Sequence, residues 1–126
     1  MDKQLKGEHV AILGASDRPD RYAYKAFQQL RAHGHRVSPV HPRLKEIDGV
    51  AVVATLQDID SPVDTVTLYV NPSILEPLIP GLVATAPRRV LFNPGTESGR
   101  AARALKAAGI EVEEACTLVL LSTGAF

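Results

Sequence analysis

Two short turns carry the residues whose types and spacing point to chemistry. The first, Gly14-Ala15-Ser16, follows an apolar run, and a glycine there lets backbone amides face a phosphate at the start of the next helix. The second, His41-Pro42-Arg43, follows the next apolar run. Pro42 stiffens that turn, and Arg43 can present a planar fork of donors to a phosphate monoester. The two turns together predict a site for a nucleotide whose ribose is phosphorylated.

The second turn also bears on the class of nucleotide. Dinucleotide sites for NAD place an acidic residue after this strand, where it binds the ribose 2′-hydroxyl. This chain has no acidic residue in that turn, and its G-x-G-x-x-G pattern is incomplete because Ser16 and Pro19 occupy the second and third glycine positions. NAD is therefore disfavoured. An ordinary turn glycine and a solvated surface arginine remain the alternative explanations for the two turns.

Other residues after strands or near the first turn are weaker candidates. Arg21, with its basic neighbours Arg18 and Lys25, can strengthen a positive field over a pyrophosphate, although a solvated helix start explains them nearly as well. Asn71-Pro72 and Asn93-Pro94-Gly95 would border the cleft with rigid backbone that offers carbonyls and amides. Ordinary strand-ending turns are an equally good explanation for these two segments.

The chain offers little for catalysis. Its four histidines have no metal-ligand spacing with Cys116 or with a carboxylate cluster, and no Ser–His–Asp arrangement can be assigned. We therefore predict no catalytic residue and no metal site, and we expect a binding protein rather than an enzyme. Cys116 is either an exposed thiol near the cleft or, more commonly for this residue type, a small buried hydrophobe.

Alternating strands and helices must position these turns. We expect strands at residues 10–13, 36–40, 65–70, 89–92 and 110–113, and helices at 22–33, from 73 onward and at 99–108. This alternation predicts an α/β fold, a Rossmann-like doubly wound parallel sheet of about five strands, in a single domain over residues 1–126. Ligands of such sheets bind at the carboxyl ends of the strands, where all the candidate turns lie.

Local patterns give finer expectations. Asp20 and Ser98 are predicted N-caps, and Ser73 with Glu76 three positions later predicts a capping box. Residues 50–53 predict a minor strand, and residues 56–59 predict one helical turn. The apolar residues 117–121 predict a last short strand or a contact between subunits.

Bulk composition excludes several classes of partner. The 126 residues contain fourteen basic and fourteen acidic side chains, so no overall field attracts nucleic acid or an anionic membrane. No apolar run approaches the roughly 20 residues of a membrane span, and residues 1–6 are not followed by the apolar core of a signal peptide. A single cysteine fits a reducing compartment, and we expect a cytoplasmic protein.

The first third of the chain resembles a known family, the stand-alone CoA-binding domain proteins, which are similar to the N-terminal domain of the succinyl-CoA synthetase alpha subunit. The resemblance rests on Gly14-Ala15-Ser16-Asp17, Pro19, Arg21, Tyr24, Gly34 and Pro39-Val40-His41-Pro42-Arg43, and it continues through Gly49, Leu56, Asp58-Ile59, Val63-Asp64 and Cys116.

The resemblance implies how a ligand would lie. It implies a Rossmann-like domain that holds the CoA nucleotide and pyrophosphate against Gly14-Ala15-Ser16, with Arg43 near the adenosine 3′-phosphate. Val70, Asn71 and Pro72 would lie along adenine. The synthetase's phosphorylated histidine belongs to a second domain, so the resemblance implies no ligase reaction for these residues.

Three hypotheses of function follow. The first is non-catalytic binding of CoA or an acyl-CoA. The second is an NADP-dependent oxidoreductase, since Arg43 suits a 2′-phosphate equally well, although the missing glycines count against it. The third is a homodimer or a partner subunit of an acyl-CoA ligase, which the apolar residues 118–121 suggest.

Overall fold

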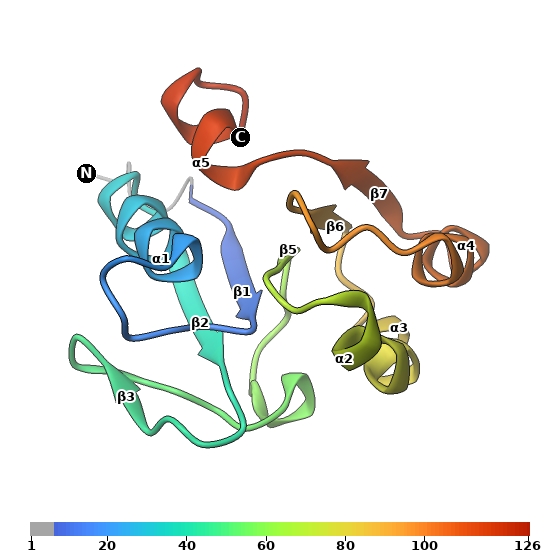
Figure 1. Cartoon of the computed structure of the whole chain (residues 1–126), viewed down its shortest axis with the longest axis horizontal. Helices are drawn as coiled ribbons and strands as arrows, with labels where there is room; N and C mark the ends of the chain where they lie inside the picture. Colours follow the sequence, from blue (N-terminus) through green and yellow to red (C-terminus); the bar gives the residue numbers. More distant parts are fainter. Residues whose placement is uncertain (1–6) are drawn as a thin grey trace.

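Five parallel strands form the central sheet, in the order β2-β1-β5-β6-β7 (Figure 1). The computed structural model describes residues 7–126, so the expectation for residues 1–6 lies outside the described residues. The strands are β1 (His9–Leu13), β2 (Arg36–Val40), β5 (Thr65–Leu68), β6 (Arg89–Phe92) and β7 (Glu111–Glu114). The predicted α/β class with a Rossmann-like parallel sheet is confirmed.

The central strands are buried on both faces, as their continuous apolar sequences predict. In β1, Val10 and Ile12 join one hydrophobic cluster, whereas Ala11 and Leu13 join the other. The edge strand β7 differs because its glutamates leave it partly exposed. Charged side chains on an edge strand discourage pairing with another chain.

Helices cover both faces of the sheet and make a three-layer fold (Figure 1). One face packs against α1 (Tyr22–Ala32) and α5 (Thr117–Ser122), which lie beside each other. The other face packs against α2 (Pro72–Leu75), α3 (Ile79–Thr85) and α4 (Gly99–Ala107). The helical stripe predicted in α1 is buried at each of its positions, Ala23, Ala26, Phe27 and Leu30. No helix within residues 7–126 is long and apolar enough to cross a membrane.

Three local predictions are wrong. Residues 117–121 form the helix α5 instead of a strand, because Leu121 packs into the cluster beneath α1. The N-cap of α1 is Arg21 instead of Asp20, and its side chain makes no capping hydrogen bond. The N-cap of α2 is Asn71 instead of Ser73, since Asn71 Oδ1 accepts a hydrogen bond from the amide of Ile74 at 2.9 Å. The predicted cap at Ser98 is confirmed.

A small hairpin follows β2. It consists of β3 (Glu46–Ile47) and β4 (Val50–Ala51), so the minor strand predicted at 50–53 is shorter than expected. Asp48 and Gly49 both have positive φ, as a tight two-residue hairpin turn with the twist of its strands requires. Next come the short helical turns η2 (Leu56–Asp58), as predicted, and η3 (Glu76–Leu78), which joins α2 to α3.

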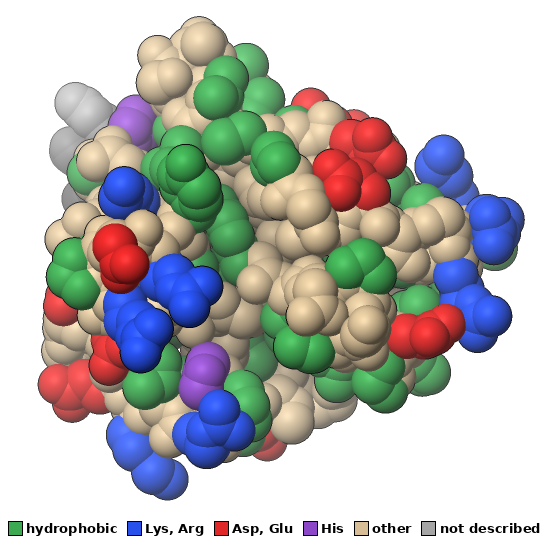
Figure 2. Space-filling model, in the orientation of Figure 1, with side chains coloured by type: hydrophobic (Ala, Val, Ile, Leu, Met, Phe, Trp, Pro, Cys, Tyr) green, Lys and Arg blue, Asp and Glu red, His purple; other side chains and the backbone are tan. Residues whose placement is uncertain are grey.

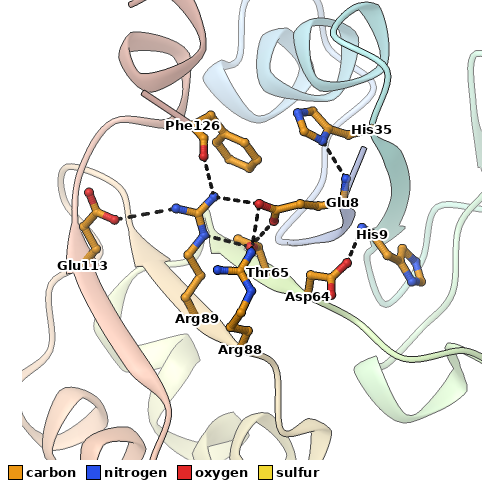
Figure 3. A network of polar contacts seen from close by, with 9 residues as sticks. All are labelled: Glu8, His9, His35, Asp64, Thr65, Arg88, Arg89, Glu113 and Phe126. Carbon is orange, nitrogen blue, oxygen red and sulfur yellow. Dashed lines mark hydrogen bonds and ion pairs between the residues drawn. The ribbon is translucent and has the colours of Figure 1, made fainter. Parts of the chain in front are cut away.

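A buried arginine joins the segments at the amino ends of the strands (Figure 3). Arg89 is only 7% exposed. It donates hydrogen bonds from Nε to Thr65 Oγ1 at 2.9 Å and from Nη2 to Glu8 Oε2 at 3.4 Å. It also donates to the backbone oxygen of Phe126 at 3.1 Å and lies over the ring of that residue. This network therefore connects the segment before β1 with β5, β6 and the residues after α5.

Candidate functional site

The strand order determines where a ligand can bind. After β1 the chain moves outward to β2, and it then returns to β5 on the other side of β1. In open parallel sheets, the crevice at such a reversal is the usual ligand site, at the carboxyl ends of the strands. The turns after β1, β2 and β5 therefore meet at one place, as the sequence predicts.

A cavity of about 1030 Å³ lies at this place, and we call it the polar cavity. Its volume is at the upper end of the range for small-molecule sites. It is bordered by the turn after β1, the start of α1, the turn after β2 and the end of β5. The lining residues are Gly14–Arg18, Asp20–Ala23, His41–Leu44, Tyr69–Asn71 and Ile74.

Gly14 allows the turn after β1 to pass close to the turn after β5. Its φ is +94°, and a Cβ atom there would lie 2.7 Å from Val70 Cγ1 and 2.8 Å from the Tyr69 oxygen. The amides of Gly14 and Ala15 both donate to the Val40 oxygen, at 3.1 and 3.0 Å. These two amides are therefore not free to bind a phosphate, because both donate to β2. Donors for a phosphate must come from residues after Ala15.

The start of α1 supplies such donors. No side chain caps this helix, its first turn contains no acidic residue, and Tyr22 and Ala23 line the polar cavity. The first amides of a helix have no partner within the helix, and the helix dipole makes this end positive. An uncapped helix start that borders a cavity is therefore suited to an anion.

The turn after β2 is organised by the ring of His41. Its Nδ1 accepts hydrogen bonds from the amides of Arg43 at 3.0 Å and Leu44 at 3.1 Å. Nδ1 can accept only without a proton, so these contacts assign the neutral tautomer with the proton on Nε2. Arg43 is thereby held at the rim of the polar cavity.

Arg18, Arg21 and Arg43 give the polar cavity a basic rim, with Asp17 and Asp20 beside them. Figure 2 shows Lys and Arg side chains gathered between α1 and the β3–β4 hairpin, with acidic side chains among them. Because the chain has no net charge, this local group provides the attraction for an anionic ligand.

Tyr69 lines the polar cavity at the end of β5. Burial raises the pKa of its phenol to about 12, an effect that hydrogen bonding to Thr117 partly opposes. The phenol is therefore neutral across the physiological pH range. Tyr69 accordingly adds no charge to the wall of the cavity.

A second cavity, of about 640 Å³, adjoins the first, and we call it the apolar cavity. The two cavities share the wall residues Gly14, Pro42, Val70 and Ile74. The apolar cavity continues between η2 and the α2–η3 segment, where Leu56, Pro77 and Leu78 line it. A ligand with a charged part and a flat apolar part fits the pair of cavities.

Most of the predicted binding residues come together here: Gly14, Ala15, Ser16, Arg21, His41, Pro42, Arg43, Val70 and Asn71. Pro72 lies beside them as the first residue of α2 but lines neither cavity. Tyr69 and Ile74 also line the site but were not predicted, since a strand end and a short helix give no sign of which side chains face a cavity.

Asn93 lies elsewhere, within the core, and only 2% of it is exposed. Its Nδ2 donates to Thr67 Oγ1 at 2.6 Å and to the Leu68 oxygen at 2.8 Å, while its Oδ1 accepts from the Thr117 amide at 2.9 Å. Asn93 thus joins β5, β6 and α5, and it does not line the polar cavity.

A serine and a histidine lie in contact at the opposite end of the sheet. His9 Nε2 is 2.7 Å from Ser38 Oγ, and its Nδ1 is 2.7 Å from the Pro62 oxygen. Neither His9 nor Ser38 lines either cavity. We therefore interpret His9 as a buried structural histidine, both of whose ring nitrogens have a hydrogen-bond partner. Within residues 7–126, no group of three or more His, Cys, Asp or Glu side chains is placed to hold a metal ion.

Known proteins resemble this chain in both fold and sequence. A solved structure of an uncharacterized protein superposes with a TM-score of 0.90 at 40% identity, covering 95% of this chain and 98% of that one. The uncharacterized protein YneT of Bacillus subtilis (strain 168) is 34% identical over 64 residues, which are 51% of this chain and 47% of YneT.

A ligase subunit is also related. The alpha subunit of the ADP-forming acetate–CoA ligase II from Pyrococcus furiosus is 32% identical over 62 residues, which are 48% of this chain and 14% of that subunit. The matching segment therefore spans less than half of either curated relative. The family model described as "CoA binding domain" matches residues 8–122. With this match over nearly its whole length, the chain belongs to the CoA binding domain family.

Proposed function

We propose that the polar cavity binds CoA or an acyl-CoA without catalysing a reaction. The proposal rests on one observation: the uncapped start of α1 and the turn that carries Arg43 border the same cavity. The chain also belongs to the CoA binding domain family. CoA carries both a pyrophosphate and a ribose 3′-phosphate, so it can use both features at once.

The pyrophosphate is assigned to the start of α1. The amides of Tyr22, Ala23 and Ser16 can donate to phosphate oxygens, since the next amide, of Tyr24, donates to the Arg21 oxygen. Arg18 and Arg21 add charge at the rim. The Gly14-Ala15-Ser16 turn retains a role, because Gly14 brings the backbone close enough for a ligand to lie between the ends of β1 and β5.

The 3′-phosphate is assigned to Arg43, whose guanidinium can bind a phosphate monoester through two donors. Adenine is assigned to the apolar cavity beside Val70, which belongs to the wall that the two cavities share. Asn71, which lines the polar cavity, and Pro72 follow Val70 in the chain. Asn71 would contribute its backbone here, because its side chain caps α2.

The test compares CoA with dephospho-CoA, which lacks only the 3′-phosphate. In titration calorimetry, Arg43→Ala should weaken CoA binding about 10- to 100-fold, since hydrogen bonds to charged groups contribute about 1.5–3 kcal/mol. Its binding of dephospho-CoA should not change. Arg36→Ala is the matched control, because Arg36 lies on β2 and its side chain is 61% exposed.

Two results would overturn the proposal. One is that the wild-type protein does not bind CoA. If it does bind, CoA at a concentration ~100 times its dissociation constant should raise the free energy of unfolding by about 2.7 kcal/mol. The other is tighter binding of NADPH than of CoA, which would favour an NADP-dependent oxidoreductase.

The likeness to a ligase alpha subunit supports a second candidate function, as a CoA-binding partner of a ligase chain. Light scattering of the native protein tests both this and the homodimer. A monomer that copurifies with no second protein would contradict both assemblies.

A further inference from the structure

We propose that His41 is a positioning residue, whose ring aims Arg43 at the ligand phosphate without contacting the ligand itself. The ring does so through the two hydrogen bonds that its Nδ1 accepts from the amides of Arg43 and Leu44. The part of this inference that concerns CoA rests on the proposed function, whereas the part that concerns the turn does not.

The geometry is that of a side chain that replaces a backbone turn. Asn, Asp, Ser and Thr commonly accept from amides two or three residues further on and so hold a turn in shape. Here an imidazole nitrogen does the same at the second and third following residues. Pro42 lies between His41 and Arg43 and has no N–H group, so the ring takes the amides of the next two residues, Arg43 and Leu44.

The backbone hydrogen bonds that hold the rest of the loop lie at its ends, and the Leu44 side chain packs against the hydrophobic cluster beneath α1. The His41 amide donates to the Val53 oxygen at 3.0 Å, and the Val52 amide donates to the Lys45 oxygen at 2.9 Å. Between these two points, within residues 7–126, the ring of His41 is the one hydrogen-bond partner of the Arg43 and Leu44 amides. Removal of the ring therefore leaves both amides without a partner and loosens the backbone that carries the guanidinium.

Freeing this backbone should affect one part of the ligand only. An arginine that is ordered before binding loses less conformational entropy when it binds a phosphate. Dephospho-CoA does not use Arg43, so its affinity does not depend on the order of the turn. This selectivity separates positioning of Arg43 from direct contact of the ring with the nucleotide.

The experiment uses the full chain and two substitutions of His41. His41→Ala should weaken CoA binding about tenfold and leave dephospho-CoA binding unchanged. His41→Asn should restore CoA binding to within about threefold of wild type, because an amide oxygen can accept from the same two N–H groups. In an Arg43→Ala background, His41→Ala should have no further effect, since coupled residues are not additive.

Hydrogen exchange of the free protein tests the turn without any ligand. The Arg43 and Leu44 amides should exchange faster in His41→Ala than in wild type, and His41→Asn should restore their protection. Unchanged protection in His41→Ala would overturn the inference even if the wild-type protein binds no CoA. Equal weakening of CoA and dephospho-CoA would also overturn it, because the ring would then contact a part that both ligands share.

Discussion

The hydroxyl of Tyr24 donates a hydrogen bond to Asp48 Oδ2 at 2.8 Å and so joins helix α1 to the turn of the β3–β4 hairpin. These two elements continue from the two basic walls of the polar cavity, which are the start of α1 and the turn that carries Arg43. The bond to Asp48 is the main reason that the pKa of Tyr24 is raised, with smaller effects from burial and from the Asp48 charge. A contact outside the cavity thus connects the two elements that follow its basic walls.

Tyr24→Phe should loosen the hairpin, so that the amides of residues 46–51 exchange faster than in wild type. A raised pKa stabilises the folded state below the ordinary tyrosine pKa of 10.0, and this contribution is lost as pH rises through the folded-state value. The difference in urea midpoint between wild type and Tyr24→Phe should thus begin to shrink above about pH 10 and disappear only once the pH exceeds the raised folded-state pKa of Tyr24. Tyr22→Phe is the control, since Tyr22 is 68% exposed; an equal effect of both substitutions would contradict this role of Tyr24.

Gly14→Ala should destabilise the protein far more than Gly34→Ala. Both glycines have positive φ, which costs an alanine about 1–2 kcal/mol. Only at Gly14 would the new Cβ also collide with Val70 and the Tyr69 backbone, whereas nothing lies within 4 Å at Gly34. Urea unfolding followed by circular dichroism should show the difference, and equal losses would mean that the turns after β1 and β5 are not in close contact.

Asn93→Ala should lower the free energy of unfolding by about 2–4 kcal/mol, because it leaves buried partners in β5 and α5 without hydrogen bonds. Chemical denaturation measures this loss. Under conditions in which Asn93→Ala is folded, it should bind CoA with the wild-type affinity. A tenfold loss of CoA affinity without a loss of stability would instead place Asn93 in contact with the ligand.

The unfolding free energy should fall on mild acidification because of His35. Burial lowers the pKa of His35, with smaller lowering effects from His33 and Arg89 and an opposing effect from Glu8. A lowered pKa means that the unfolded state binds the proton more tightly, so stability is complete above the ordinary value of 6.5 and declines as pH falls below it. Protonation also removes the acceptor of the Glu8 amide (Figure 3).

Urea denaturation between pH 7.5 and roughly pH 5.5 checks this linkage. His35→Gln should flatten the dependence of stability on pH, whereas His33→Gln, at an exposed position, should reduce it only slightly, because it removes one of the smaller effects on the pKa of His35. A slope that is the same in wild type and His35→Gln would show that another group is responsible.

Much of the architecture follows from local sequence. Continuous apolar runs and the stripe at Ala23, Ala26, Phe27 and Leu30 identify the central strands and α1, because burial on one face or both imposes these patterns. The run at 117–121 is too short for periodicity to distinguish a strand from a helix, and its packing against α1 decides in favour of α5. The cap at Asn71 did carry a signal, since proline favours the first position of a helix.

The candidate site was predictable where it depends on turns after strands and not where it depends on packing. Gly14 and Arg43 could be located from the sequence because they follow apolar runs whose carboxyl ends must meet. The commitment of the Gly14 and Ala15 amides to Val40, and of Asn93 to the core, depends on which strands become neighbours. No local sequence pattern predicts which strands become neighbours in the sheet.

The buried Arg89 network secures the sheet at the end farthest from the ligand cavities, and this separation makes the protein a convenient scaffold for redesign (Figure 3). None of the hydrogen-bond partners that Arg89 has within the described residues lies in residues 15–21 or 41–44, so we expect substitutions in these loops to leave its contacts in place. New ligand preferences can therefore be selected at one end of the sheet, with Gly14 retained, while the contacts of Arg89 stay intact at the other.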